Sequence, residues 1–104
     1  MFDERLTEII CGEFEGMEET PEMMKAAFQA FQIGGKGTER MDLFIKRNCD
    51  FCDWVMDEYK GKNILIVTHA ANTRVINYYF NGKPKDYDFL KRVVDSGRVI
   101  TLDN

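Results

Sequence analysis

The chain has 104 residues, of which 44% are hydrophobic and 12% aromatic, and this composition suits one globular domain, residues 1–104, with one modest core. Its 18 acidic and 14 basic residues give a net charge of −4 at pH 7, which argues against nucleic acid and anionic membrane surfaces as partners. The chain has no run of 18 apolar residues and no signal-like leader, so we expect a cytoplasmic protein without a membrane segment.

The N-terminal half predicts a loop followed by two helices. Residues 1–19 are rich in glutamate and lack a sustained apolar period, which is typical of a loop or one short turn. Thr20, Pro21 and Glu22 have the pattern of a helix start, and this helix is expected to end at Gly34–Gly35. A second helix is expected from Thr38 to near Gly61. Apolar residues recur at helical spacing in both helices and are expected to face a core: Met24, Ala27, Phe28 and Phe31, then Met41, Ile45, Cys52, Val55, Met56 and Tyr59.

The C-terminal half predicts two strands around a third helix. The run "ILIVT", residues 64–68, is β-branched and apolar without alternation, as in a strand buried on both faces of a parallel sheet. A helix is expected from about Ala71 to Phe80, ending at Asn81–Gly82, and its aromatic residues 78–80 are expected to pack against the sheet. The alternating segment "RVITLDN", residues 98–104, predicts a second strand. The chain is therefore expected to have an α/β fold.

A sheet of only two strands is marginally stable in water, so we expect a further element or a second chain to pair with it. The apolar residues 64–68 would expose one edge of this sheet. Two copies of the chain can cover such an edge around a two-fold axis. We therefore predict a homodimer; the alternative is a monomer in which a helix or the N-terminal loop covers the edge.

The single histidine of the chain, His69, follows the predicted strand directly and precedes the third helix. The free N–H groups at a helix N-terminus favour an anion, and an imidazole can add a donor or a positive charge. This arrangement predicts a phosphate site at His69. In the alternative interpretation, His69 is a polar residue that merely ends a strand.

Two motifs together resemble a known family. The segment "ILIVTHAANTRVINYYFNGKPKD" is similar to the second half of the histidine phosphatase superfamily, phosphoglycerate mutase-like branch, where a strand ends in Ser/Thr-His-Gly and a helix with Arg follows. The segment "ERLTEIICGEFEG" resembles that branch's Arg-Leu-x-Glu motif followed by Gly-x-x-x-Gly. The resemblance extends over residues 3–104 and implies the C-terminal part of a three-layer fold with a small, mostly parallel sheet and flanking helices.

The resemblance implies roles for three residues. His69 corresponds to the family's second active-site histidine, which contacts the transferred phosphoryl group, and Glu8 corresponds to the carboxylate that donates and accepts the proton of the leaving oxygen. Ala70 replaces the usual glycine, but its backbone N–H can still contact phosphate. These chemical types suit phosphoryl transfer, which needs donors for the phosphoryl oxygens and an acid for the leaving group. No metal or other cofactor is implied.

The family's nucleophile is a histidine in an N-terminal Arg-His-Gly segment, and this chain contains neither that segment nor a second histidine. The expected function is phosphoryl transfer or hydrolysis on a phosphomonoester, with catalysis lost or severely reduced in this chain. The alternative is a non-catalytic oligomerising or partner-binding module that keeps the remaining fold.

Other polar clusters have simpler interpretations. Three cysteines and one histidine could form a zinc or redox site around Cys49 and Cys52, but both cysteines fall within the apolar stripe of a predicted helix. Glu13 and Glu15 could bind a metal, although a solvated loop is the simpler interpretation. Arg74 could approach a bound phosphate or pair with a neighbouring carboxylate. The three thiols are expected to be free.

Overall fold

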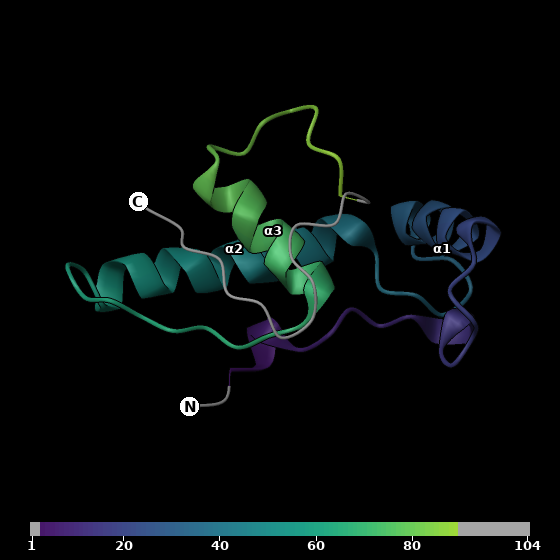
Figure 1. Ribbon diagram of the computed structural model, residues 1–104, viewed down its shortest axis with the longest axis horizontal. Coiled ribbons are helices and arrows are strands. Elements are labelled where there is room, and N and C mark those ends of the chain that lie inside the picture. Colours follow the sequence, from purple (N-terminus) through teal and green to yellow (C-terminus); the bar gives the residue numbers. More distant parts are fainter. Residues whose placement is uncertain (1–2, 90–104) are drawn as a thin grey trace. The chain divides into compact units, whose positions relative to one another are not determined.

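A computed structural model describes residues 3–89 of the chain (Figure 1). This part contains three α-helices, α1 (Pro21–Ile33), α2 (Met41–Glu58) and α3 (Ala70–Phe80), and two short 3₁₀ helices, η1 (Glu4–Leu6) and η2 (Gly12–Phe14). The described residues form two compact units, one of residues 9–46 and one of residues 3–8 together with 47–89. The boundary between the units falls within α2.

The N-terminal segment is more structured than the predicted loop or single turn, because it contains both η1 and η2. The Asp3 carboxylate accepts a hydrogen bond of 2.9 Å from the Arg5 amide and thereby caps η1. The same carboxylate pairs with the Arg5 guanidinium at 2.6 Å. This pairing lowers the pKa of Asp3, and the hydrogen bond to Asp3 raises the pKa of Arg5.

The structure confirms the first predicted helix as α1. The Thr20 hydroxyl accepts a 3.1 Å hydrogen bond from the Met23 amide, so Thr20 is the N-cap residue, and the proline follows at the first helical position. In the unit of residues 9–46, Ala27 and Ala30 of α1 pack with Phe14 into a small core. Of the predicted apolar stripe of α1, Ala27 is buried in this core and Phe31 packs against it.

The second predicted helix is present as α2, but it begins at Met41 rather than at Thr38. The Thr38 hydroxyl donates a 2.6 Å hydrogen bond to the Gly35 carbonyl. It is thus used in the turn after α1 and does not cap α2. The helix ends at Glu58, close to the predicted end near Gly61.

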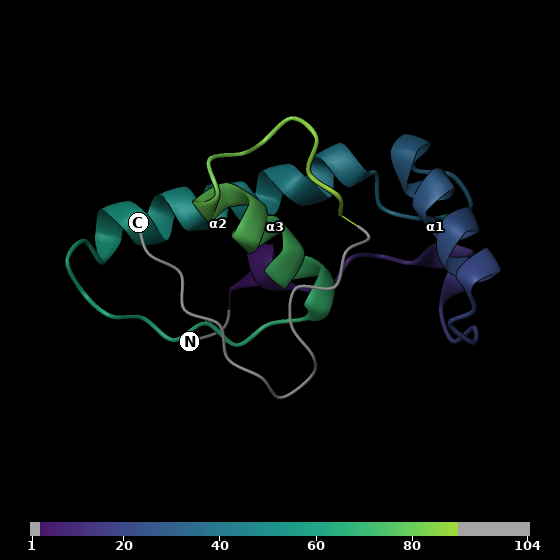
Figure 2. The ribbon, with the colours of Figure 1, turned by 45° about the horizontal axis from the view of Figure 1, so that its top comes forward.

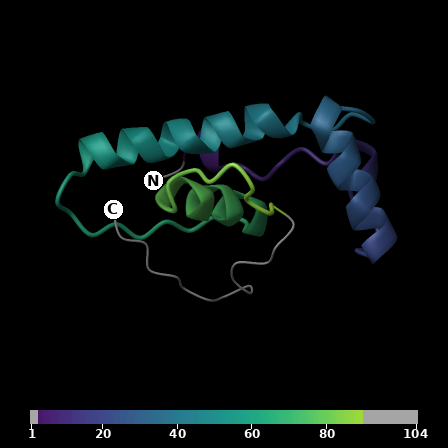
Figure 3. The same cartoon turned by 90° about the horizontal axis from the view of Figure 1, so that it is seen from above.

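In the other unit, α3 packs against α2, as Figure 3 shows from above. The core between them consists of Phe51, Cys52 and Val55 of α2 with Ile76 of α3. Partly buried apolar side chains surround this core, and they are Leu6, Trp54, Ile66, Tyr79 and Phe80. Tyr79 and Phe80 therefore pack against a helical core instead of a sheet, whereas the Tyr78 ring contacts Tyr87 and Phe89.

The predicted α/β fold with a mostly parallel sheet is wrong for the described residues, because they are helical and contain no strand. Residues 62–69, including "ILIVT", join α2 to α3 as an irregular segment (Figure 2). Ile64, Leu65 and Val67 are 42%, 78% and 85% exposed. The physical reason is that a strand exists only through hydrogen bonds to a neighbouring strand, and residues 3–89 provide none. The second predicted strand, residues 98–104, lies outside the described residues.

No helix within residues 3–89 is both long enough and apolar enough to cross a membrane.

Candidate anion site at the start of α3

His69 occupies the N-cap position of α3, with extended backbone angles (φ −94°, ψ 163°). Its carbonyl accepts 3.0 Å hydrogen bonds from the amide and the hydroxyl of Thr73. Its imidazole makes no capping hydrogen bond and is 54% exposed. The structure thus confirms that the histidine immediately precedes a helix, with a side chain that solvent and solutes can reach.

The first turn of α3 presents amides that suit an anion. By helix geometry, the N–H groups of Ala70, Ala71 and Asn72 have no acceptor within their own helix. Together with the helix dipole they favour negative charge beside the N-cap residue. Ala70 is exposed, so the predicted phosphate-binding amide lies at an accessible helix end.

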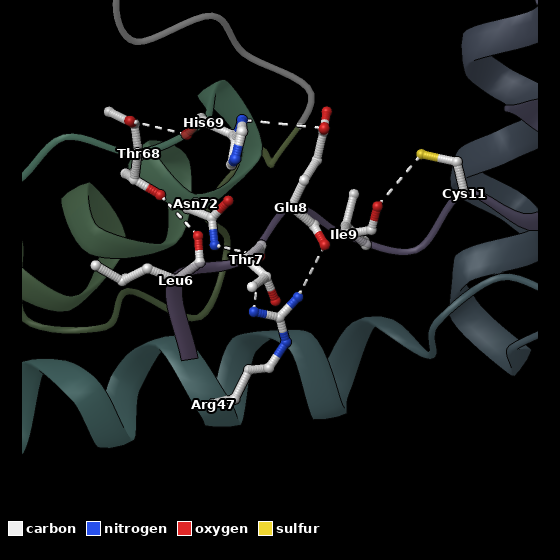
Figure 4. A network of polar contacts seen from close by, with 10 residues as sticks. Leu6, Thr7, Glu8, Ile9, Cys11, Arg47, Thr68, His69 and Asn72 are labelled. Atoms are coloured by element: carbon white, nitrogen blue, oxygen red, sulfur yellow. Dashed lines mark hydrogen bonds and ion pairs between the residues drawn. The ribbon is translucent and has the colours of Figure 1, made fainter. Parts of the chain in front are cut away.

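Glu8 lies next to His69. The Nδ1 atom of His69 is 3.9 Å from Oε2 of Glu8, and the Glu8 side chain is 63% exposed (Figure 4). The structure therefore brings together the two residues that the resemblance pairs. Because both side chains are solvated, this contact contributes little to folding stability, and its interest is chemical.

The backbone that carries Glu8 is held by α2. Nη1 of Arg47 donates 2.8 Å hydrogen bonds to the carbonyls of Arg5 and Thr7. Its Nη2 donates a 3.2 Å hydrogen bond to the carbonyl of Glu8. One guanidinium therefore binds three carbonyls of a four-residue segment, and Figure 4 shows its bonds to Thr7 and Glu8.

The segment that carries Glu8 is also held by α3 and by Thr68, the residue before His69. The Thr68 hydroxyl donates a 3.0 Å hydrogen bond to the Leu6 carbonyl. Nδ2 of Asn72 donates to the Thr7 carbonyl at 3.0 Å and to Oδ1 of Asn48 at 2.9 Å. Asn48 and Asn72 are both 0% exposed. These bonds tie the Glu8 segment to the elements on both sides of His69.

Sequence reasoning missed Arg47, Asn48 and Asn72. A signal existed for the two asparagines: Asn48 lies four residues from Phe44 and from Cys52, on a buried face of α2, and Asn72 precedes the buried Val75. A buried amide on an apolar face needs hydrogen-bond partners. The pattern indicates that the two asparagine amides form a buried pair. It does not reveal that the Thr7 carbonyl is the third member of this hydrogen-bond network.

Arg74 is half-buried in α3. Its Nε atom is buried and has no hydrogen-bond partner among the residues that the structure describes, and the same holds for Oδ1 of Asn72. No ion pair of Arg74 with a carboxylate occurs in residues 3–89. The structure thus gives no support to the expected pairing of Arg74 with a neighbouring carboxylate.

The cysteines do not form a reactive or metal-binding cluster in the described part of the chain. Cys11, Cys49 and Cys52 are free thiols. Burial raises the pKa of Cys49 and raises that of Cys52 to about 12, so both thiols stay protonated near neutral pH. Within residues 3–89, no three side chains of the metal-ligating types converge. Glu13 and Glu15 are exposed, as expected for a solvated loop.

Comparison with known protein families gives one match over nearly the whole chain. The family model of the histidine phosphatase superfamily (branch 1) matches residues 1–102. No curated protein and no solved structure matches the chain. The matched range includes the Glu8 segment, the Arg47 helix and the His69 helix, which together form the site described above. The chain therefore belongs to the histidine phosphatase superfamily, branch 1.

Proposed function

We propose that the start of α3 binds the phosphoryl group of a phosphomonoester, with His69 and the Ala70 amide as donors and Glu8 as the acid. Membership of the superfamily supports a phosphatase-like function on phosphate substrates. The observation that carries the assignment to these residues is the 3.9 Å separation of Glu8 and His69 beside the free amides of a helix N-terminus.

The chemistry assigns a different task to each side chain. When the phosphoryl group passes from the leaving oxygen to an attacking nucleophile, negative charge spreads over the phosphoryl oxygens, where a protonated imidazole and the Ala70 N–H stabilise it. The leaving alkoxide takes a proton from the carboxylic acid form of Glu8. Both side chains are exposed, so a substrate can approach them without a large rearrangement of the core.

Covalent catalysis also needs a nucleophile. The chain has one histidine, so when His69 binds the phosphoryl oxygens no second imidazole remains in this chain to be phosphorylated. We therefore propose that the chain by itself binds phosphate but hydrolyses p-nitrophenyl phosphate negligibly. Turnover that His69→Ala abolishes would contradict this part of the proposal and would identify His69 as the nucleophile.

Phosphate binding is tested by NMR titration of the ¹⁵N-labelled chain with millimolar inorganic phosphate at pH 6. We expect the amide signals of Ala70 and Ala71 to shift. In His69→Asn, which keeps a residue suited to the N-cap position, the shifts should become smaller. Unchanged Ala70 and Ala71 signals in the wild-type chain would contradict the proposal.

A second candidate function, self-association, rests on the exposed apolar segment before His69. We propose that two copies of the chain form a homodimer through Ile64, Leu65 and Val67, whose side chains are exposed in the structure. When this patch of one copy packs against a second copy, apolar surface is removed from water. Sedimentation equilibrium at micromolar concentration tests this. A mass of 12.1 kDa that does not change with concentration would contradict it.

A further inference from the structure

We propose that Arg47 is a positioning residue that directs the Glu8 carboxyl toward His69. The inference deepens the proposed function and rests on it for the role of Glu8, but its geometric content can be tested without phosphate. Arg47 donates three hydrogen bonds to the Glu8 segment, and all three go to backbone carbonyls. Arg47 would therefore act through Glu8 and is not a catalytic residue.

The direction of a solvated side chain is set by the backbone that carries it. Glu8 is 63% exposed, so surrounding core side chains do not hold it. The direction of its Cα–Cβ bond then depends on the two peptide planes that flank its Cα atom. These planes carry the carbonyls of Thr7 and Glu8, and Arg47 donates hydrogen bonds to both.

The guanidinium is suited to this task because its donors form a rigid planar fork. Nη1 binds the Arg5 and Thr7 carbonyls at 2.8 Å, and Nη2 binds the Glu8 carbonyl at 3.2 Å. Hydrogen bonds from a charged donor are stronger than those between neutral groups. A lysine ammonium has three donors, but they sit on one atom at the end of a flexible stem, so it does not hold the two peptide planes around Glu8 in the fixed geometry of the fork.

The position set by Arg47 is defined relative to His69 because the network continues into α3. The Thr7 carbonyl accepts hydrogen bonds from both Arg47 and Asn72. Asn72 lies in the first turn of α3, and His69 is the N-cap residue of the same helix. Figure 4 shows Arg47 and Asn72 meeting at Thr7, with the Glu8 side chain extending toward His69. These hydrogen bonds therefore hold the backbone of Glu8 at a defined position relative to His69.

The first experiment measures proximity directly. In NOESY spectra of the full chain, we expect a cross peak between the γ protons of Glu8 and the ring Hε1 of His69. Arg47→Lys and Arg47→Gln should lose this cross peak but keep the cross peaks between Val55 and Ile76 that report the core. Arg40→Lys is the matched control, because Arg40 is an exposed arginine that pairs with Asp42 at 2.6 Å, and it should leave the Glu8 cross peak unchanged.

The second experiment measures coupling through inorganic phosphate. The Glu8 carboxylate repels a bound anion, so Glu8→Gln should tighten phosphate binding several-fold in the wild-type chain and in Arg40→Lys. In the Arg47→Lys chain the same change should have no effect, because Glu8 no longer lies beside the anion. A role of Arg47 in stability alone would leave this coupling intact.

The outcomes separate the two proposals. A persistent Glu8 cross peak in both Arg47 variants, or an unchanged effect of Glu8→Gln in Arg47→Lys, would overturn the positioning role. Loss of the core cross peaks in both Arg47 variants would also overturn it, since Arg47 would then be needed for folding. If the wild-type chain binds no phosphate but the NOESY results are as expected, the proposed function fails and the positioning of Glu8 stands.

Discussion

The Nδ1 atom of His69 lies 3.9 Å from Oε2 of Glu8, although the two residues are far apart in the sequence. Both side chains are more than half exposed, whereas the groups that bring them together, above all Asn48 and Asn72, are buried. The site therefore consists of a solvated pair carried by a buried hydrogen-bond network. This division predicts that substitutions in the pair and in the network differ in their effect on stability.

Glu8→Gln should leave the free energy of unfolding within about 0.5 kcal/mol of the wild-type value, because solvated ion pairs contribute little. Urea unfolding followed by circular dichroism measures this. The change in the free energy of unfolding should be small both at low and at physiological ionic strength. A loss well above 1 kcal/mol would show that Glu8 is part of the core network.

Asn72→Ala should destabilise the chain by about 1–3 kcal/mol, because the buried Oδ1 of Asn48 loses the hydrogen bond from Asn72 and the Thr7 carbonyl loses one of the two hydrogen bonds that it accepts from Arg47 and Asn72. Asn63→Ala, at an exposed position between α2 and α3, is the matched control and should change the unfolding free energy by less than about 0.5 kcal/mol. Equal effects of the two substitutions in urea unfolding would contradict the buried network.

Gly12→Ala should destabilise the chain far more than Gly16→Ala, although both glycines belong to one sequence motif. Gly12 and Gly16 have φ of 53° and 79°, so an alanine strains the backbone at either position, which costs about 1–2 kcal/mol. At Gly12, the added Cβ would also overlap the backbone of Lys36 and Gly37, whereas nothing lies within 4 Å at Gly16. Comparable melting temperatures for the two variants would refute the close approach at Gly12.

The chain should lose stability as the pH rises from about 8.5 toward 12. In the folded state, burial raises the pKa of Cys52 to about 12, and the hydrogen bond to Asp53 raises that of Tyr79 to about 12. The unfolded chain releases these protons at lower pH, near 8.5 for a thiol and 10 for a phenol. The stabilisation is therefore complete below the unfolded values and is lost above them. Urea unfolding at several pH values measures the slope, which Cys52→Ala should reduce.

Ile66→Asp should destabilise the chain by more than Val67→Asp. Ile66 packs against the core of α2 and α3, whereas Val67 is 85% exposed. A charge at position 67 therefore stays in water in the monomer, and one at position 66 is forced into an apolar contact. Thermal unfolding below the concentration of any association compares the two variants. A larger effect at position 67 would mean that the apolar segment is covered within one chain.

Helices were predictable because their signals are local. The Thr20 cap, the proline after it and the 3.6-residue apolar period all act within a few residues, and the structure confirms α1, α2 and α3. The start of α2 was misplaced, because Thr38 has two possible partners. It could cap a helix or bond back to the Gly35 carbonyl, and only the folded turn determines which occurs.

The sequence by itself determined the three helices, the position of His69 directly before α3, and the family through two motifs. The tertiary structure alone decided the state of residues 64–68, since β-branched residues form a strand only when a partner strand supplies hydrogen bonds. It also decided that Arg47 and Asn72 hold the backbone beside Glu8. Their acceptors are carbonyl groups, which every residue carries, so no residue type in the sequence marks which carbonyls a distant side chain will bind.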